Sequence, residues 1–433
     1  MARRNRVLGN VLLLVGLFVL AGVLIALIPL LRRIEPIMPP ESSEMAAKRF
    51  APENAFFVIV EAVSLLPPTL PPAVVKSKDN PRFQEKYRQE EGSLGWLLEV
   101  ERPDDDPKLM EYLDACEPAV VKTREALQRP YFLLPIDWAT CPKLADAQNP
   151  QTKLKGAYRL GLLLMARGVQ ASRAGDEAGA LKGLLEAIRF GLLLRDEGRT
   201  GDMLVLPCIY AMARGWSDAT LEQALKDIRA LHAEVGPPAA NLTFLLRDMD
   251  CGAFSPMPPP RGNVVERVFQ DAVRSYERRQ LRKWALTHRD DLFDLIKQSY
   301  PAIRKRRQGL WEELGQNDAA GKVTSFVSEL ALTKAVTDAG FSGAALIVAL
   351  ERYRRANGGY PETLDALVPM YIDEIPKDPF TDSALVYKRA GEDYQLHSAG
   401  YNEKDDGGGF IPEGRSRQRG DDVVIHWPRA AQD

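Results

Sequence analysis

The sequence lacks the motifs by which most enzymes are recognised. It has four histidines and four cysteines among 433 residues, and no HExxH, GxSxG or GxGxxG pattern occurs in it. Residues 315–322 superficially resemble a phosphate-binding loop, but five residues separate the glycines and Val323 stands where serine or threonine is required. His288-Arg289-Asp290 resembles a kinase catalytic loop, without the asparagine or the glycine-rich loop that such a site needs. We therefore favour a function without catalysis.

The chain also lacks the excess of positive charge that is typical of nucleic-acid binding. Its net charge is −2. Residues 1–33 contain five arginines and no acid, so the 52 basic and 59 acidic side chains of residues 34–433 give that part a net charge of −7. Basic clusters at 278–283 and 304–307 lie among acidic residues, and we interpret them as solvated helix faces rather than as membrane-surface or nucleic-acid patches. No nucleic acid is expected as a partner.

A long apolar run lies close to the N-terminus. Val11–Leu31 carries no charge over 21 residues, and a helix of that length is about 30 Å long, which matches the hydrocarbon core of a bilayer. A buried core helix and a cleaved signal peptide are the alternatives, but the run shows no polar face and no small-residue cleavage site follows it. We expect residues 1–33 to form an uncleaved signal anchor, a single transmembrane helix in the cell (inner) membrane.

The charges that flank this run predict its orientation. Arg3, Arg4 and Arg6, together with the N-terminal amine, outnumber Arg32 and Arg33 on the other side. Because positive charge favours the cytoplasmic side, we expect a cytoplasmic N-terminus and an extracytoplasmic body.

The cysteine spacing fits neither a zinc ribbon nor a redox motif. We expect the four thiols to be free and buried on helices. An oxidising compartment would permit disulfides, and a bond between Cys116 and Cys141, which would close the shortest loop, is the alternative. The four are Cys116, Cys141, Cys208 and Cys251.

Helical periodicity prevails in residues 34–325, which we expect to form an α-helical ectodomain with the character of a bundle. The clearest signal is a helical hairpin at 153–197, whose turn is Ala174-Gly175-Asp176. This hairpin weakly resembles a tetratricopeptide unit, although no 34-residue recurrence is present. Further helices are expected at 53–66, at 108–128 with a break at Pro118, within 201–225, and at 264–307 with a break at Pro301, whereas 32–53 is expected to form a stalk and 236–262 a loop.

Residues 326–433 predict a small α+β module, so the fold class is mainly α with a short antiparallel sheet. A long helix over 325–357 is expected to end at Gly358-Gly359, and a short helix to begin at Pro361. Strands are expected at 384–388, 394–397 and 423–427.

The order of short motifs in this module is similar to that of a known family. The motifs are Leu350-Glu351-Arg352-Tyr353, Gly359-Tyr360-Pro361, Asp378-Pro379-Phe380, Tyr387, Ser398-Ala399-Gly400, Asp405-Asp406-Gly407-Gly408 and Asp421-Asp422-Val423. In this order they resemble the C-terminal domain of the type II secretion major pseudopilin. The resemblance implies a long helix packed on a small antiparallel sheet, with a calcium ion bound in the last loop.

The residues of that loop suit calcium, which takes several oxygen ligands with loose geometry. The alternative is an ordinary turn with solvated acids. Asn402 stands where the family more often has aspartate, which removes one charge from the set. The candidate ligands are Asn402, Asp405, Asp406, Asp421 and Asp422.

The predicted anchor and the module together indicate where the protein is located, but not a reaction that it catalyses. We expect a membrane-anchored protein of the bacterial envelope with an interaction or scaffolding role, possible partners being envelope or secretion proteins. An ordinary filament subunit is not expected, because the apolar span contains no acid and a long helical region separates it from the module. The alternative is an envelope hydrolase with a carboxylate-based site in the helical region, which would need facing carboxylates of different pKa.

Overall fold

The computed structural model describes residues 36–67, 107–140, 150–195, 209, 212–237, 239–251, 264–313, 318–407 and 422–426. Within these ranges the chain is mainly helical, with a three-stranded antiparallel sheet near the C-terminus, as predicted. The expected membrane span lies outside the described residues.

The first described helices pack against one another around Asn54. The Asn54 side chain accepts a hydrogen bond from the Phe56 N–H and donates to the carbonyls of Arg49 and Leu133, so it begins one helix and holds a distant strand-like segment. The expected stalk is wrong in part, because residues 43–50 form a helix. The elements are α2 (Ser43–Phe50), α3 (Ala55–Ser64), α6 (Pro107–Ala115) and α7 (Glu117–Leu127).

The break expected at Pro118 is present, two residues before the proline. The helix α6 ends at Ala115, and Pro118 lies in the first turn of α7, where its missing N–H is not needed. Cys116 lies between the two helices as a buried free thiol, and burial raises its pKa. Cys251 is half-buried at the end of a later helix, and Cys141 and Cys208 lie outside the described residues.

The hairpin predicted at 153–197 is confirmed as α8 (Tyr158–Arg173) and α9 (Glu177–Arg195). Gly175 adopts φ +78° in the turn, and the Asp176 carboxylate accepts the Gly179 N–H at 2.9 Å. A Cβ atom on Gly183 would lie 2.6 Å from the Cα of Gly168, so the two helices approach each other more closely than larger residues would allow. In the described part of the chain, 3-10 helices at Trp138–Thr140 and Pro150–Leu154 precede the hairpin.

Of two expectations for the next segment, the structure confirms one in part and overturns the other. Residues 209, 212 and 213, within the expected 201–225, are helical, and α11 (Asp218–Glu234) begins in the same stretch, where Ser217 caps it by accepting the Thr220 N–H. The loop expected at 236–262 contains the helix α12 (Ala239–Asp250). Its apolar residues at helical spacing, Leu242, Leu245, Leu246 and Met249, are buried, and this periodicity outweighs the flanking prolines.

The charge-dense region that follows forms α13 (Val264–Leu295) and α14 (Tyr300–Glu313). The chain breaks just before Pro301 rather than at it, since Pro301 occupies the first turn of α14.

The helix α15 (Asp318–Asn357) links the two parts of the molecule. With 40 residues it is about 60 Å long. It contacts α11, α13 and α14, and also strands β2 and β3 and the 3-10 helix η4 (Leu364–Leu367). The stretch Ser325–Asn357 is long and apolar enough to cross a membrane, but 72% of its most apolar window is buried within the protein, as in a core helix.

The sheet is formed by β1 (Val386–Ala390), β2 (Asp393–Ser398) and β3 (Val423–His426), in the order β1-β2-β3. Gly358, with φ +77°, ends α15 as predicted. A Cβ atom on Gly343 would lie 2.6 Å from Ile425 Cγ2, so β3 packs directly onto the backbone of α15. The long helix packed on a small antiparallel sheet, which the resemblance implies, is therefore present.

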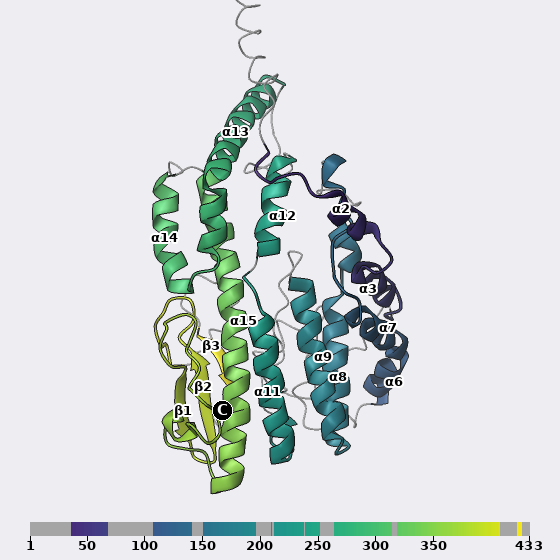
Figure 1. Ribbon diagram of the computed structural model, residues 1–433, viewed down its shortest axis with the longest axis vertical. Coiled ribbons are helices and arrows are strands. Elements are labelled where there is room, and N and C mark those ends of the chain that lie inside the picture. The colour runs from purple at the N-terminus through teal and green to yellow at the C-terminus, as the bar shows by residue number, and fades with distance from the viewer. Residues whose placement is uncertain are drawn as a thin grey trace, which may run out of the picture.

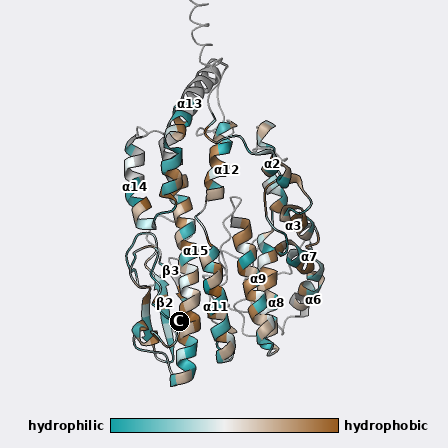
Figure 2. Cartoon of the chain, in the orientation of Figure 1, coloured by the Kyte–Doolittle hydropathy of each residue, from teal (hydrophilic) through white to brown (hydrophobic). Residues whose placement is uncertain are grey.

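The helices stand side by side along the long axis of the molecule (Figure 1). The row runs from α15 through α11, α9 and α8 to α7 and α3, each contacting the next. Hydrophobic residues prevail along α8 and α9, whereas hydrophilic residues are prominent on the sheet (Figure 2). One hydrophobic cluster includes Phe56, Leu184, Ile228, Leu346 and Leu396, so the core is continuous across residue 325, where α15 itself passes. The division into an ectodomain at 34–325 and a module at 326–433 stays a prediction.

Candidate metal centre

The acidic loop of the C-terminal module lies between β2 and β3. His397 and Ser398 are the last residues of β2 and pair with Val424 and Val423 of β3. Asp422 immediately precedes β3, and this pairing therefore places it beside the end of β2. The register shifts between Leu396 and His397, an irregularity that is common next to sites where a strand redirects a side chain.

Three side chains converge at this end of the sheet. His397 Nε2 lies 2.9 Å from Asp405 Oδ1 and 3.7 Å from Asp422 Oδ2. One potential ligand atom from each of the three residues lies within 4.8 Å of the others. The side chains of His397 and Asp422 are 3% and 0% exposed, whereas that of Asp405 is 51% exposed. We call these three residues the His397 cluster.

Backbone N–H groups hold both carboxylates in place. Asp405 Oδ1 accepts the Gly407 N–H at 2.8 Å, and Gly407 adopts φ +80°, which suits glycine. The Asp422 carboxylate accepts the Asp406 N–H at 3.2 and 3.4 Å. The hydrogen bond from His397, followed by that from the Gly407 backbone, lowers the pKa of Asp405. Both carboxylates are thus directed toward the imidazole before any ligand is bound.

The predicted ligands divide into two groups. The structure brings Asp405 and Asp422 together, as the calcium prediction requires. Asn402 and Asp406 instead contact each other, with Nδ2 of Asn402 donating to Asp406 Oδ2 at 2.8 Å, while Asn402 Oδ1 accepts the Lys404 N–H at 2.8 Å. Asp421 lies outside the described residues. The calcium ion stays a prediction.

Sequence reasoning missed His397. The available signal was a histidine at the buried end of a predicted strand, directly before the turn that leads into the acidic loop. Its contact with Asp422 joins residues that are distant in sequence, and only the pairing of β2 with β3 creates it.

The other motifs of the predicted family have structural roles in this chain. Asp378, which is 1% exposed, accepts the Phe380 N–H at 2.9 Å, the Ser398 hydroxyl at 2.8 Å and the Ala399 N–H at 3.0 Å. This carboxylate therefore ties the Asp378-Pro379-Phe380 turn to the end of β2 that carries His397.

A second buried carboxylate fixes the end of α15. Glu351 is fully buried. Its carboxylate accepts a hydrogen bond from the Tyr360 hydroxyl and another from Arg354 Nε at 2.8 Å. The Tyr387 hydroxyl donates to the carbonyl of Pro361 at 2.7 Å. The Gly359-Tyr360-Pro361 turn is thus held between the helix and β1.

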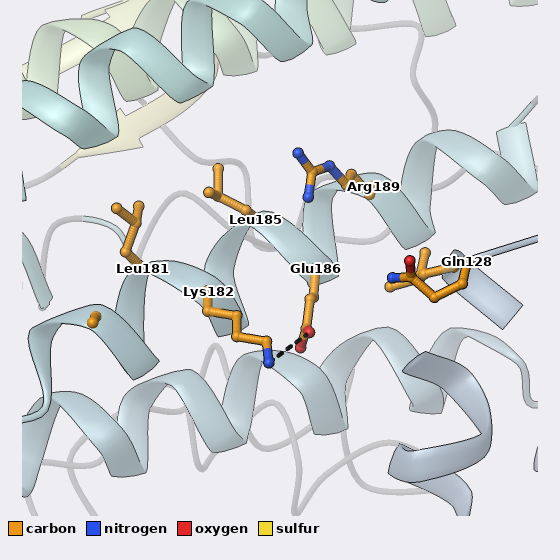
Figure 3. Close-up of a pocket in the computed structure, with 8 residues that line it drawn as sticks. Gln128, Leu181, Lys182, Leu185, Glu186 and Arg189 are labelled. Atoms are coloured by element: carbon orange, nitrogen blue, oxygen red, sulfur yellow. Dashed lines mark ion pairs between the residues drawn. The ribbon is translucent and has the colours of Figure 1, made fainter. Parts of the chain in front are cut away.

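A cavity of about 520 Å³ lies in the helical region, between the end of α7 and the outer face of α9 (Figure 3). Glu186 is the carboxylate among its lining residues. It pairs with Arg124 at 2.9 Å and lies 3.9 Å from Lys182, toward which it points in Figure 3. Its carboxylate is therefore engaged by two basic side chains. The lining residues are Leu127, Gln128, Ala178, Leu181, Lys182, Leu185, Glu186 and Arg189.

Comparison with protein-family models, with characterised proteins and with solved structures finds no match to this chain. The class that the described residues define is a mainly helical protein with a small α+β module at its C-terminal end. The resemblance to the pseudopilin domain and the weaker one to a tetratricopeptide unit stay predictions.

Proposed function

We propose that this chain is a membrane-anchored scaffold protein of the bacterial envelope, and that its helical body presents the C-terminal module to envelope or secretion proteins. The observation that carries the proposal is the way the described chain begins. At Ile37 and Met38, a few residues after the predicted membrane span, the backbone is bound to the helical body.

Asp250 at the end of α12 makes this attachment. Its carboxylate accepts the N–H of Ile37 at 2.8 Å and that of Met38 at 3.0 Å. Arg282 of α13 lies 3.0 Å from the same carboxylate, and Arg289 donates to the Ile37 carbonyl at 3.3 Å. The Ile37 side chain is fully buried. We call this arrangement the Asp250 clamp.

The clamp sets how the body would face the bilayer. Ile37 is the sixth residue after Leu31, the end of the predicted span, and a fully extended chain over these six steps reaches about 20 Å. The end of the body that carries the clamp would therefore lie close to the membrane surface. The sheet lies toward the opposite end of α15 (Figure 1), so the module would be presented away from the membrane.

Site-specific photo-crosslinking in cells tests the proposal. A photoreactive residue at Met370, which is 75% exposed in the module, is expected to capture envelope or secretion components. The same residue at Val121 of α7, which is also exposed, serves as the matched control on the body. Capture of such components from position 370 but not 121 supports presentation by the module. Recovery of none of them from either position contradicts the scaffold role.

A carboxylate-based hydrolase is the second candidate, on one observation. Asp248 of α12 is half-buried, and desolvation raises its pKa to about 6, which is a range suited to general acid or base chemistry. Hydrolysis of ester, peptide or glycoside substrates by the purified chain, abolished by Asp248→Asn, would support this candidate. Equal activity in the variant, or no hydrolysis by either protein, would contradict it.

A further inference from the structure

The His397 cluster offers a mixed set of ligand atoms. Calcium takes six to eight oxygen ligands and does not favour nitrogen. Here the buried Nε2 of His397 lies between two carboxylates, and the other two described acidic-loop candidates, Asn402 and Asp406, are bonded to each other. The described atoms therefore fit an all-oxygen calcium site poorly.

The geometry points to a binding site for a borderline divalent cation such as Zn²⁺, held by His397, Asp405 and Asp422. Imidazole and carboxylate groups are common ligands of zinc and related transition metals. This inference concerns the loop alone and does not depend on the membrane anchor or on the scaffold role.

The distances from the imidazole suit this coordination. In a tetrahedral zinc site with bonds of about 2.0–2.1 Å, neighbouring ligand atoms lie about 3.3 Å apart. The distances from His397 Nε2 to the two carboxylates, 2.9 and 3.7 Å, lie on either side of that value. The ligand atoms of the three residues lie within 4.8 Å of one another, so the carboxylates would move inward around the ion, and the exposed Asp405 is the side chain best able to do so.

The surroundings of the cluster fix two of the three ligands. The Gly407 N–H donates to Asp405, and the Asp406 N–H donates to Asp422. Ligands that are held by their neighbours lose little freedom when the ion binds. The side of the cluster that carries Asp405 faces solvent, so water would complete the coordination there.

A bound ion would join three separate segments of the module. His397 belongs to β2, Asp405 to the acidic loop and Asp422 to the start of β3. An ion bound to all three would stabilise the folded module, because the unfolded chain does not hold the ligands together.

The test uses the full-length chain, purified in detergent and freed of metal with a chelator. Zn²⁺, Co²⁺, Ca²⁺ and Mg²⁺ are titrated separately, with the melting temperature, calorimetric stoichiometry and Co²⁺ absorption spectrum as readouts. We expect one Zn²⁺ per chain, a raised melting temperature, a tetrahedral Co²⁺ spectrum, and no shift with Ca²⁺ or Mg²⁺ at the same concentration.

Variants show whether the cluster holds the ion. His397→Gln and Asp405→Asn are each expected to raise the Kd for Zn²⁺ at least tenfold. Asp405→Asn alters an exposed side chain and keeps the test valid if His397→Gln does not fold. His426→Gln is the matched control, since His426 is also buried in the sheet but contacts Asp393 at 2.8 Å instead of the cluster. Its Kd should not change.

Three results would overturn the inference. Binding of Ca²⁺ that is unaffected by His397→Gln would show an all-oxygen site of the kind that the resemblance implies. Zinc binding that is weakened equally in all three variants would place the ion elsewhere. An unchanged melting temperature and no bound ion would leave the cluster as a hydrogen-bonded element of the fold only.

Discussion

The α8–α9 hairpin and the C-terminal module are held together by different interactions. The hairpin relies on apolar burial and on two glycines, Gly168 and Gly183, that bring the helix backbones close together. The module combines apolar burial with buried polar groups, above all Asp378 and Glu351, which fix its turns. Satisfied polar contacts therefore define its turns and short strands, whereas close packing of two backbones defines the hairpin.

The largest effect is expected from Asp378→Ala in the module. The substitution leaves two N–H groups and one hydroxyl without their buried acceptor, which costs about 4 kcal/mol of the free energy of unfolding. Chemical denaturation measures the change. Glu374→Ala, at an exposed position nearby, is the control and should alter stability by less than about 0.5 kcal/mol. Equal effects of the two substitutions would show that the module does not depend on the buried hydrogen bonds of Asp378.

Asp248 provides the opposite case, a half-buried residue whose buried Oδ1 has no hydrogen-bond partner among the described residues. Its folded pKa of about 6 exceeds the ordinary value of 3.8, so the folded state binds the proton more tightly than the unfolded state. Stability should therefore fall as pH rises from about 4 to 6, by at most about 3 kcal/mol. Asp248→Asn should remove this dependence. Chemical denaturation at several pH values measures the stability of both proteins. The same pH dependence in both would show that Asp248 is not its source.

The Asp250 clamp joins the start of the described chain to the helical body, and Asp250→Ala tests it. Loss of the carboxylate leaves two backbone N–H groups and Arg282 without this acceptor, and we expect a loss of about 2 kcal/mol. Limited proteolysis near residue 37 should become faster. Asp294→Ala, an exposed acid of α13, is the control. Unchanged cleavage in the Asp250 variant would mean that the segment is held by its apolar contacts alone.

Two glycines of α9 offer the smallest and most specific comparison. Gly183→Ala places a methyl group 2.6 Å from Gly168 Cα and should cost about 1.5 kcal/mol. Gly191→Ala meets no atom within 4 Å and should stabilise the helix by about 0.5–1 kcal/mol, because alanine has the higher helix propensity. Thermal unfolding measures both. Changes of the same sign would contradict close packing as the basis of the hairpin.

Local signals predicted the elements of the module well. The end of α15 at Gly358 and the turn at Gly391 both use positive φ angles, which glycine adopts without strain, so the sequence marks them directly. The helix α12 was not predicted, because the prolines on either side of it indicated a loop. The four apolar residues at helical spacing were the signal that the prediction overlooked. Of the candidate metal ligands, Asp405 and Asp422 were predicted together, while His397 was not.

The sequence alone determined the elements whose causes are local. Apolar periodicity produced the hairpin, glycine ended α15, and residue alternation between turns marked the strands. Tertiary structure alone decided which distant groups meet: Asp250 with Ile37, Asp378 with Ser398, and His397 with Asp422. Such contacts depend on how helices pack and strands pair over the whole core, and no single stretch of sequence carries that information.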